Sequence, residues 1–335
     1  MVNLNIKKSV IPILWLDTFA IIKLTKYKEE KEKLNEVEQN RYEKLNKLLF
    51  DKINDEKLLC PKGDQQKEIV LGKRMIDESK ESQMYLSLGI RFKIRSQIFR
   101  DQQIIFLKAF YEKNKSVKLN FKEAFYNDPI KELKKVNDYI VTINTNRLER
   151  QTEEIKNNKL YLKNEFEEIR KKKIEKGISY EEELTKEYEG YSNGYLRKYY
   201  NYLEKLLKGE NTTINDFFNA EPVLRLLNIW DKYGGNPEGI KGIENFFESK
   251  YFKSIPYVDI SSKLYSYLMT SRNKIKSGDS MDVDQISAVL PYCNFVFVDK
   301  KMAHILKDLE IDKKYNTKVF STTNFDNFIE ALTNL

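Results

Sequence analysis

The chain has 335 residues, of which 41% are hydrophobic and 33% charged, so it is long enough for more than one domain and apolar enough to bury a core. This composition excludes disorder as the dominant state. The 59 Lys and Arg residues exceed the 51 Asp and Glu residues, and the net charge of +8 is a mild bias toward a polyanionic partner such as nucleic acid. The two cysteines are too few for a disulfide framework, which fits a reducing compartment.

The N-terminal segment carries an apolar run at residues 9–16 that ends abruptly at Asp17. The run is too short for a signal peptide or a membrane span, so we expect a cytoplasmic protein without a membrane partner. It is typical of a strand buried on both faces, as in a parallel sheet covered by helices. Residues 19–54 are then expected to be helical, and residues 57–60 to form a second short strand that Pro61 ends.

Long segments with helical periodicity dominate the middle of the chain. A helix is expected from about Asp64, with Glu68 in its first turns. Further helices are expected over residues 84–113, 129–174, 180–208 and 240–270. The stretch 148–188 consists almost entirely of charged residues and helix formers and predicts an exposed pair of long helices. We therefore interpret residues 81–270 as an all-helical insertion.

The C-terminal segment returns to alternating helices and strands. Helices are expected over residues 282–290, 301–309 and 324–334, and strands over 294–298 and 318–321. Two α/β pieces that are far apart in the sequence, each too small for a core of its own, most simply join into one sheet. The predicted fold is α/β, with a parallel sheet sandwiched by helices that residues 1–80 and 271–335 form together as a discontinuous domain.

Acidic residues stand at the expected strand ends and helix starts. Asp17 and Asp299 each follow a strand, while Glu68 and Asp282 lie on helices that can face the same edge of the sheet. Such a cluster of carboxylates repels itself unless protons or divalent cations neutralise it. Carboxylate oxygens suit Mg²⁺ or Mn²⁺, which can activate water and stabilise the leaving oxygen of a phosphodiester. The four acids are therefore candidate metal ligands and catalytic residues.

Each acid by itself also has an ordinary explanation. An Asp after a strand starts a turn or caps the next helix, and a Glu in a first helical turn is favoured by the helix dipole. Asp284 competes with Asp282 for the third position, because both lie near the start of the same helix. Asp64 and Asp279 are at most supporting residues for the site.

Three segments of the chain resemble the PIN domain family. The apolar strand that leads into Asp17 and Thr18 resembles the opening of a PIN domain, and Cys60-Pro61-x-x-Asp64-x-x-x-Glu68 resembles its second strand and following helix. The most specific match is the segment 281–299, in which an acid opens a helix, a Leu-Pro-Tyr-Cys turn follows, and the next strand ends in an acid. The resemblance covers roughly residues 1–75 and 255–335.

The resemblance implies a PIN-like nuclease that acts on RNA in preference to DNA, with Mg²⁺ or Mn²⁺ as its cofactor. It assigns metal binding to Asp17, Glu68, Asp282 and Asp299, and it matches Thr18 to the small hydroxyl residue that often follows the first acid. Two positions depart from the pattern: Asn294 stands where the family often has Asp, and Gln66 where a more polar or basic residue is frequent. Neither departure concerns the four acids.

Basic and apolar residues alternate between residues 91 and 100. Arg91, Lys93, Arg95 and Arg100 are candidate contacts to a nucleic-acid backbone, although an amphipathic helix explains the pattern equally well. The Tyr-rich stretch 195–203 permits the same two interpretations. The single histidine, His304, has no surroundings that favour a catalytic triad, and Cys60 and Cys293 are expected in the core.

These observations predict a metal-dependent endoribonuclease, and a toxin or phage-defence role would suit its Lys-, Asn- and Ile-rich composition. The alternative is a catalytically degenerate PIN-like module that binds RNA or takes part in assembly. A homo-oligomer or a protein partner bound through the helical insertion fits either reading. A phosphatase of the haloacid dehalogenase kind is excluded because Phe19 occupies the position of its second acid, and no phosphate-binding glycine loop is present.

Overall fold

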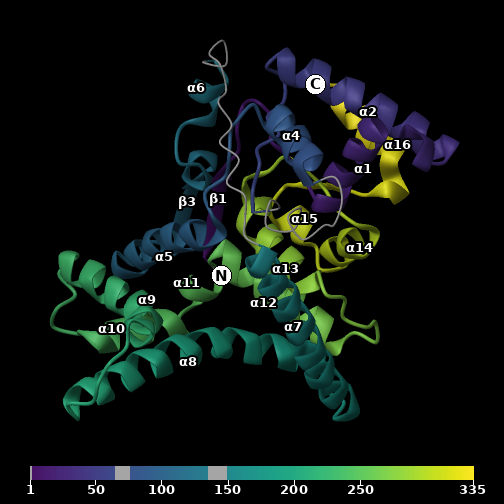
Figure 1. Ribbon diagram of the computed structural model, residues 1–335. Coiled ribbons are helices and arrows are strands. Elements are labelled where there is room, and N and C mark those ends of the chain that lie inside the picture. The colour runs from purple at the N-terminus through teal and green to yellow at the C-terminus, as the bar shows by residue number, and fades with distance from the viewer. Residues whose placement is uncertain (1, 65–75, 135–148) are drawn as a thin grey trace. The chain divides into compact units, whose positions relative to one another are not determined.

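The computed structural model describes residues 2–64, 76–134 and 149–335 of the chain (Figure 1). These residues form two compact units. The sheet unit comprises residues 6–98, 120–165 and 276–335, and the helical unit comprises residues 1–5, 99–119 and 166–275. The division into domains 1–80 with 271–335 and 81–270 stays a prediction, and the two compact units have different limits from these.

A three-stranded parallel sheet joins the two ends of the sequence. Its strands are β2 (Leu14–Leu16), β4 (Phe295–Phe297) and β5 (Lys318–Phe320), in the order β2-β4-β5. Leu14 is opposite Phe295, and Phe295 is opposite Lys318. Every residue of β2 and β4 is buried, as the uninterrupted apolar runs predict. The expectation that two distant α/β pieces share one sheet is thereby confirmed, whereas a PIN-like sandwich stays a prediction.

The other edge of β2 carries a short parallel contact from the segment before Pro61. Leu14 donates its backbone N–H to the Leu59 carbonyl at 2.8 Å, and Leu59 donates to the Pro12 carbonyl at 2.9 Å. Residues 57–60 were predicted as a strand, but only a single bridge between Ile13 and Leu59 forms. β2 therefore has neighbours on both of its edges.

The sheet unit contains eight of the described α-helices in full. They are α1 (Thr18–Glu29), α2 (Glu36–Asn54), α4 (Ile76–Ser87), α6 (Pro129–Leu133), α13 (Asp279–Val289), α14 (Lys300–Asp308), α15 (Ile311–Lys314) and α16 (Phe325–Thr333). The core of the unit includes Leu45, Phe297 and Phe328, which are fully buried. The single helix predicted over residues 19–54 is divided in two, because Asn35 caps α2 by accepting the Glu38 N–H at 2.9 Å.

The helical unit is built from longer helices. They are α8 (Tyr180–Leu207), α9 (Ile214–Lys232), α10 (Ile240–Glu248), α11 (Lys250–Lys253) and α12 (Pro256–Thr270), with most of α5 (Arg95–Tyr111) and the second part of α7 (Glu149–Glu175). The strands β1 (Asn3–Lys7) and β3 (Ser116–Asn120) pair with each other. Sequence analysis did not predict β1, β3 or α9, and α9 contains Pro222, a residue that disfavours helix interiors.

No helix in the part of the chain that the structure describes combines the length and the apolar character needed to cross a membrane.

Candidate active site

Asp17 and Asp299 lie at the carboxyl ends of two adjacent parallel strands. Asp17 donates its backbone N–H to the Phe297 carbonyl at 3.0 Å, so the pairing of β2 with β4 continues up to the first acid. Leu16 is opposite Phe297, which places Asp299 one residue beyond the position opposite Asp17. Because neighbouring strands are about 4.8 Å apart, the backbones of the two acids lie close together at one edge of the sheet.

This edge is also where the strand order reverses. From β2 the chain passes through α1 and α2 to Leu59 on one side, whereas β4 lies on the other side of β2. In open α/β sheets, ligands bind beyond the carboxyl ends of the strands at such a reversal. Asp17 and Asp299 flank the reversal, so the topology gives both carboxylates the position expected of a functional site.

Both acids also cap helices. An Asp17 carboxylate oxygen accepts the Thr18 N–H at 2.6 Å at the start of α1, and an Asp299 oxygen accepts the Met302 N–H at 2.7 Å at the start of α14. The ordinary explanation of an Asp after a strand therefore holds for each of them. Capping and ligand binding are compatible, because a carboxylate has two oxygens with several acceptor positions. Asp17 and Thr18 are buried, and Asp299 is partly exposed.

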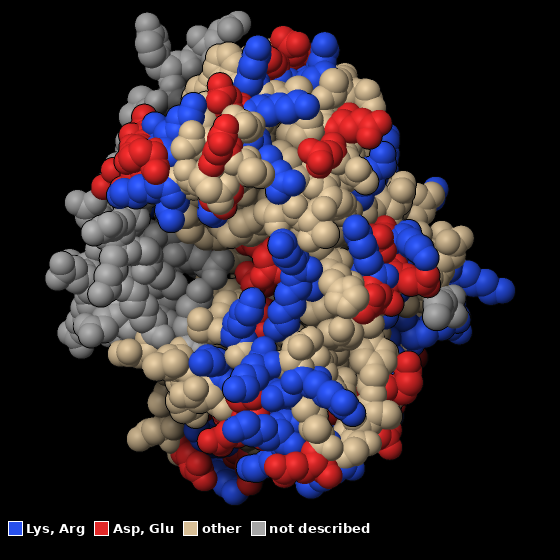
Figure 2. Space-filling view, turned by 90° about the vertical axis from the view of Figure 1, so that its right-hand side faces the viewer, with Lys and Arg blue, Asp and Glu red and all other residues tan. Residues whose placement is uncertain are grey.

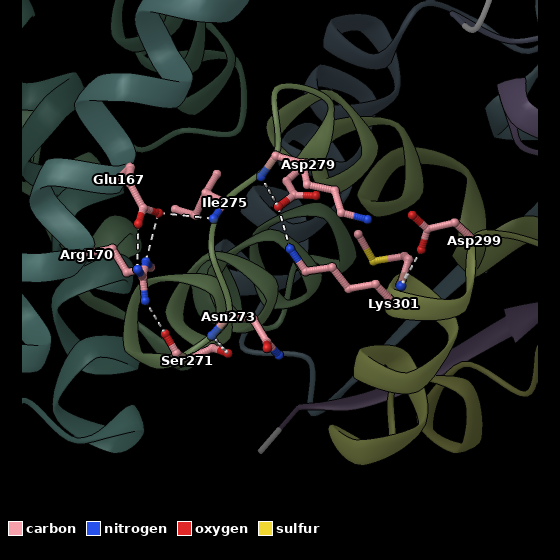
Figure 3. Close-up of polar contacts among 10 residues, drawn as sticks. Glu167, Arg170, Ser271, Asn273, Ile275, Asp279, Asp299 and Lys301 are labelled. Carbon is pink, nitrogen blue, oxygen red and sulfur yellow. Dashed lines mark hydrogen bonds and ion pairs between the residues drawn. The ribbon is translucent and has the colours of Figure 1, made fainter.

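An ion pair holds the start of α13 against the start of α14 (Figure 3). The Asp279 carboxylate accepts hydrogen bonds from the Lys301 ammonium at 2.5 Å and from the Lys276 backbone N–H at 2.8 Å. Asp279 is 4% exposed, so its charge depends on these donors. Asp282 lies in the first turn of the same helix and is partly buried. The pair thus fixes the element that carries Asp282 next to the element that Asp299 caps.

Asp284, the competing candidate for the third position, already has a cationic partner. Its carboxylate lies 3.1 Å from the Arg95 guanidinium. The Arg95 backbone N–H in turn donates to the Asp64 carboxylate at 3.3 Å. A carboxylate neutralised by arginine is a weaker ligand for a divalent cation, so the Arg95 contact weakens the case for Asp284 as a metal ligand.

The candidate metal ligands are not gathered into a metal site in the part of the chain that the structure describes. Glu68 lies outside the described residues. Within residues 2–64, 76–134 and 149–335, no group of three or more His, Cys, Asp or Glu side chains is arranged to hold a metal ion. Asp17, Asp282 and Asp299 supply hard oxygen donors of the kind that Mg²⁺ and Mn²⁺ prefer. The chemistry of these donors fits such an ion.

The basic residues between 91 and 100 have different surroundings. The Arg91 guanidinium stacks over the Tyr126 ring at 5.0 Å, and Lys93 and Arg95 line a hollow of about 10 Å³ beside Trp15. A hollow of this size holds at most one water. Arg100 belongs to the helical unit, unlike the other three. Residues 91 and 92 form bridges rather than helix, so the predicted amphipathic helix begins only at Arg95.

The single histidine and the two cysteines have surroundings that do not favour catalysis. His304 is exposed and lies 3.2 Å from Asp308, one helical turn away. Cys60 and Cys293 are buried as expected, and burial raises the pKa of each thiol to about 12, which makes them poor nucleophiles. Lys8, which the sequence did not single out, donates to the Cys293 carbonyl at 2.6 Å, and burial lowers its pKa to about 8.

A second ion pair, in the helical unit, fixes the end of the segment that follows α12 (Figure 3). Arg170 donates to both carboxylate oxygens of Glu167 and to the Ser271 carbonyl, and Glu167 accepts the Ile275 backbone N–H at 3.0 Å. The hydrogen bond from Arg170 lowers the pKa of Glu167 to about 2. Sequence analysis did not single out this ion pair. The three-residue spacing of Glu167 and Arg170, which places them on one face of a helix, could have indicated it.

The surface does not carry charge of a single sign. Lys and Arg side chains are interspersed with Asp and Glu over the face drawn in Figure 2. Charges of both signs occur on that face, and several Lys and Arg side chains lie next to one another in its lower half.

Comparison with known proteins gives no assignment, since no protein-family model, curated protein or solved structure matches this chain.

Proposed function

We propose that this chain is a metal-dependent nuclease of the PIN-like kind, an endoribonuclease whose active site lies at the carboxyl edge of the sheet. The observation that carries the proposal is the position of Asp17 and Asp299 at the ends of adjacent parallel strands, on either side of the strand-order reversal. The resemblance of three sequence segments to PIN domains supports the same assignment.

Asp17, Asp282 and Asp299 would hold the metal ion together with Glu68. Bound there, Mg²⁺ or Mn²⁺ would lower the pKa of a coordinated water and neutralise the charge that develops on the phosphodiester. The protein's own groups orient this site. The caps on Thr18 and Met302 fix the two strand-end carboxylates, and the pair of Lys301 with Asp279 fixes the start of the helix that carries Asp282. RNA as the substrate, and a toxin or phage-defence role, rest on the family resemblance and on composition.

The test compares the wild-type protein with Asp17→Asn and Asp299→Asn. Asn caps helices about as well as Asp, so each variant should keep its fold and lose only the charge that binds metal. We expect a loss of at least about a hundredfold in cleavage of single-stranded RNA with Mn²⁺ or Mg²⁺, and no cleavage by any form in EDTA. Single-stranded DNA, tested in parallel, decides between RNA and DNA.

Asp128→Asn is the matched control. Asp128 caps α6 in the same unit by accepting the Ile130 N–H at 3.2 Å, and its ion pair with Lys122 lies on the surface. This variant should retain the activity of the wild type. Equal activity of Asp17→Asn, Asp299→Asn and Asp128→Asn would contradict the proposal.

A binding or assembly module is the second candidate. The observation that favours it is that Asp17 and Asp299 already serve as helix caps, which explains both residues without a metal. Calorimetry separates the two candidates, because a nuclease site binds Mn²⁺ in the wild type and binds it more weakly in Asp17→Asn. If the protein is a module without a metal site, neither the wild type nor Asp17→Asn shows a heat of Mn²⁺ binding.

A further inference from the structure

Two stretches singled out in the sequence meet in the helical unit. Arg100 lies on α5 and Tyr195 on α8, and both stand close enough to Arg225 of α9 to influence one another electrostatically. Gln103, one turn after Arg100, and Glu221, one turn before Arg225, complete the group. We call these five residues the Arg225 cluster. All five belong to the same compact unit.

The Arg225 cluster has more positive than negative charge. Its two guanidinium groups share the single carboxylate of Glu221, whose oxygens lie 3.4 Å from Arg100 and 3.3 Å from Arg225. Both contacts are longer than the 2.7–2.9 Å that is typical of a charge-assisted hydrogen bond. Burial, with Arg100 nearby, lowers the pKa of Arg225. One positive charge is therefore left without a counter-ion among the members of the cluster.

Hydrogen-bond donors in the cluster also lack acceptors. Arg225 donates through one terminal nitrogen to the Gln103 side-chain carbonyl at 3.0 Å. The other terminal nitrogen, Nη1, and the Gln103 amide nitrogen are buried and have no hydrogen-bond partner among the described residues. The Gln103 amide cannot be turned round to repair this, because its NH₂ group would then face the guanidinium. Gln103 is only 1% exposed, so bulk water does not satisfy its amide.

We propose that the Arg225 cluster binds an oxyanion, specifically a phosphate group, in the helical unit. A phosphate carries the missing negative charge and presents several acceptor oxygens, which match the planar donor array of a guanidinium. Arg225 Nη1 and the Gln103 amide supply the buried donors. Arg100, with 46% of its side chain exposed against 23% for Glu221 and 18% for Arg225, is the most exposed of the three charged members, and the anion enters from its side. Tyr195 is close enough to both guanidinium groups to feel their charge.

The phosphate has two possible sources, a small phosphorylated molecule and the backbone of a nucleic acid. Both offer the same group, and the experiment separates them by size. The site is distinct from the carboxylate edge of the sheet unit, so it does not depend on the proposed nuclease activity. Binding is accordingly measured in EDTA, where that activity is absent.

The key variant is Gln103→Glu, which keeps the shape of the side chain but replaces the amide donor with an acceptor that pairs with Arg225. It cancels the excess charge, so the melting temperature in the absence of anion should rise. Pyrophosphate and inorganic phosphate should raise the melting temperature of the wild type more than chloride at equal ionic strength. In Gln103→Glu we expect the affinity for pyrophosphate to fall by about tenfold or more.

Arg225→Gln is the second variant, for use if Gln103→Glu proves unstable. It should also lose the rise in melting temperature with pyrophosphate. Asn201→Asp, on an exposed position of α8, adds the same negative charge elsewhere in the unit and should bind like the wild type.

A short single-stranded RNA is tested beside pyrophosphate. Gln103-dependent binding of the RNA alone identifies a nucleic-acid phosphate, and Gln103-dependent binding of pyrophosphate identifies a small ligand. Unchanged binding of both probes by Gln103→Glu, or no specific binding by the wild type, overturns the proposal.

Discussion

At the scale of single residues, each candidate acid has a different set of neighbours, and those neighbours distinguish acids that look alike in the sequence. Asp284, for example, lies 3.1 Å from the Arg95 guanidinium. Asp279 is tied to Lys301, which follows Asp299 by two residues. The sequence identifies which residues carry charge, whereas their partners come from segments up to 189 positions away, as with Arg95 and Asp284.

Lys301→Met tests the ion pair that fixes the start of α13. The substitution keeps the apolar stem of the side chain but leaves the Asp279 carboxylate buried without its cation, so we expect a loss of about 3 kcal/mol in the free energy of unfolding. Chemical denaturation measures it. The double variant with Asp279→Asn should lose much less than the sum of the two single variants, and additive losses would mean that the two residues do not interact.

At the scale of elements, the strands and the C-terminal helices were the most predictable. The apolar runs before Asp17 and Asp299 indicated β2 and β4 because strands buried on both faces leave no polar positions. α9 was missed because Pro222 suggests a break, although a capping box of Thr213 with Asp216 marks its start. Its stability comes from packing around Trp230, which local sequence patterns do not report.

Gly242→Ala tests that packing. Alanine normally stabilises a helix relative to glycine, but a Cβ at position 242 would lie 2.5 Å from the Trp230 ring. We therefore expect a destabilisation of about 2 kcal/mol from overpacking, measured by thermal or chemical unfolding. Gly190→Ala on α8 is the control, since nothing lies within 4 Å of its Cβ, and it should stabilise the protein by up to about 1 kcal/mol. Stabilisation by both substitutions would refute the close contact.

At the scale of the whole molecule, stability should depend on pH through a glutamate of the helical unit. Burial, with Glu183 nearby, raises the pKa of Glu187 to about 7 from its ordinary value of 4.5. A carboxyl group with a raised folded-state pKa favours the fold while protonated. Its contribution is fully present below pH 4.5 and is lost as the pH rises through about 7.

Glu187→Gln should therefore raise the melting temperature at pH 8 and leave it nearly unchanged at pH 4.5, because glutamine resembles the protonated acid. Scanning calorimetry at both pH values measures the difference. Glu189→Gln, at an exposed position on the same helix, should show no such difference. An equal effect of the two substitutions would show that Glu187 titrates normally.

The sequence by itself determined the alternation of helices and strands at both ends of the chain and the positions of Asp17 and Asp299 after two of the strands. Those features depend on local periodicity and on buried apolar runs, which neighbouring residues determine. Only the tertiary structure decided that β2 lies beside β4, that Arg95 pairs with Asp284, and that Arg100, Gln103 and Arg225 meet. These contacts join residues far apart in the chain, and they form because the burial of whole helix and sheet faces brings them together.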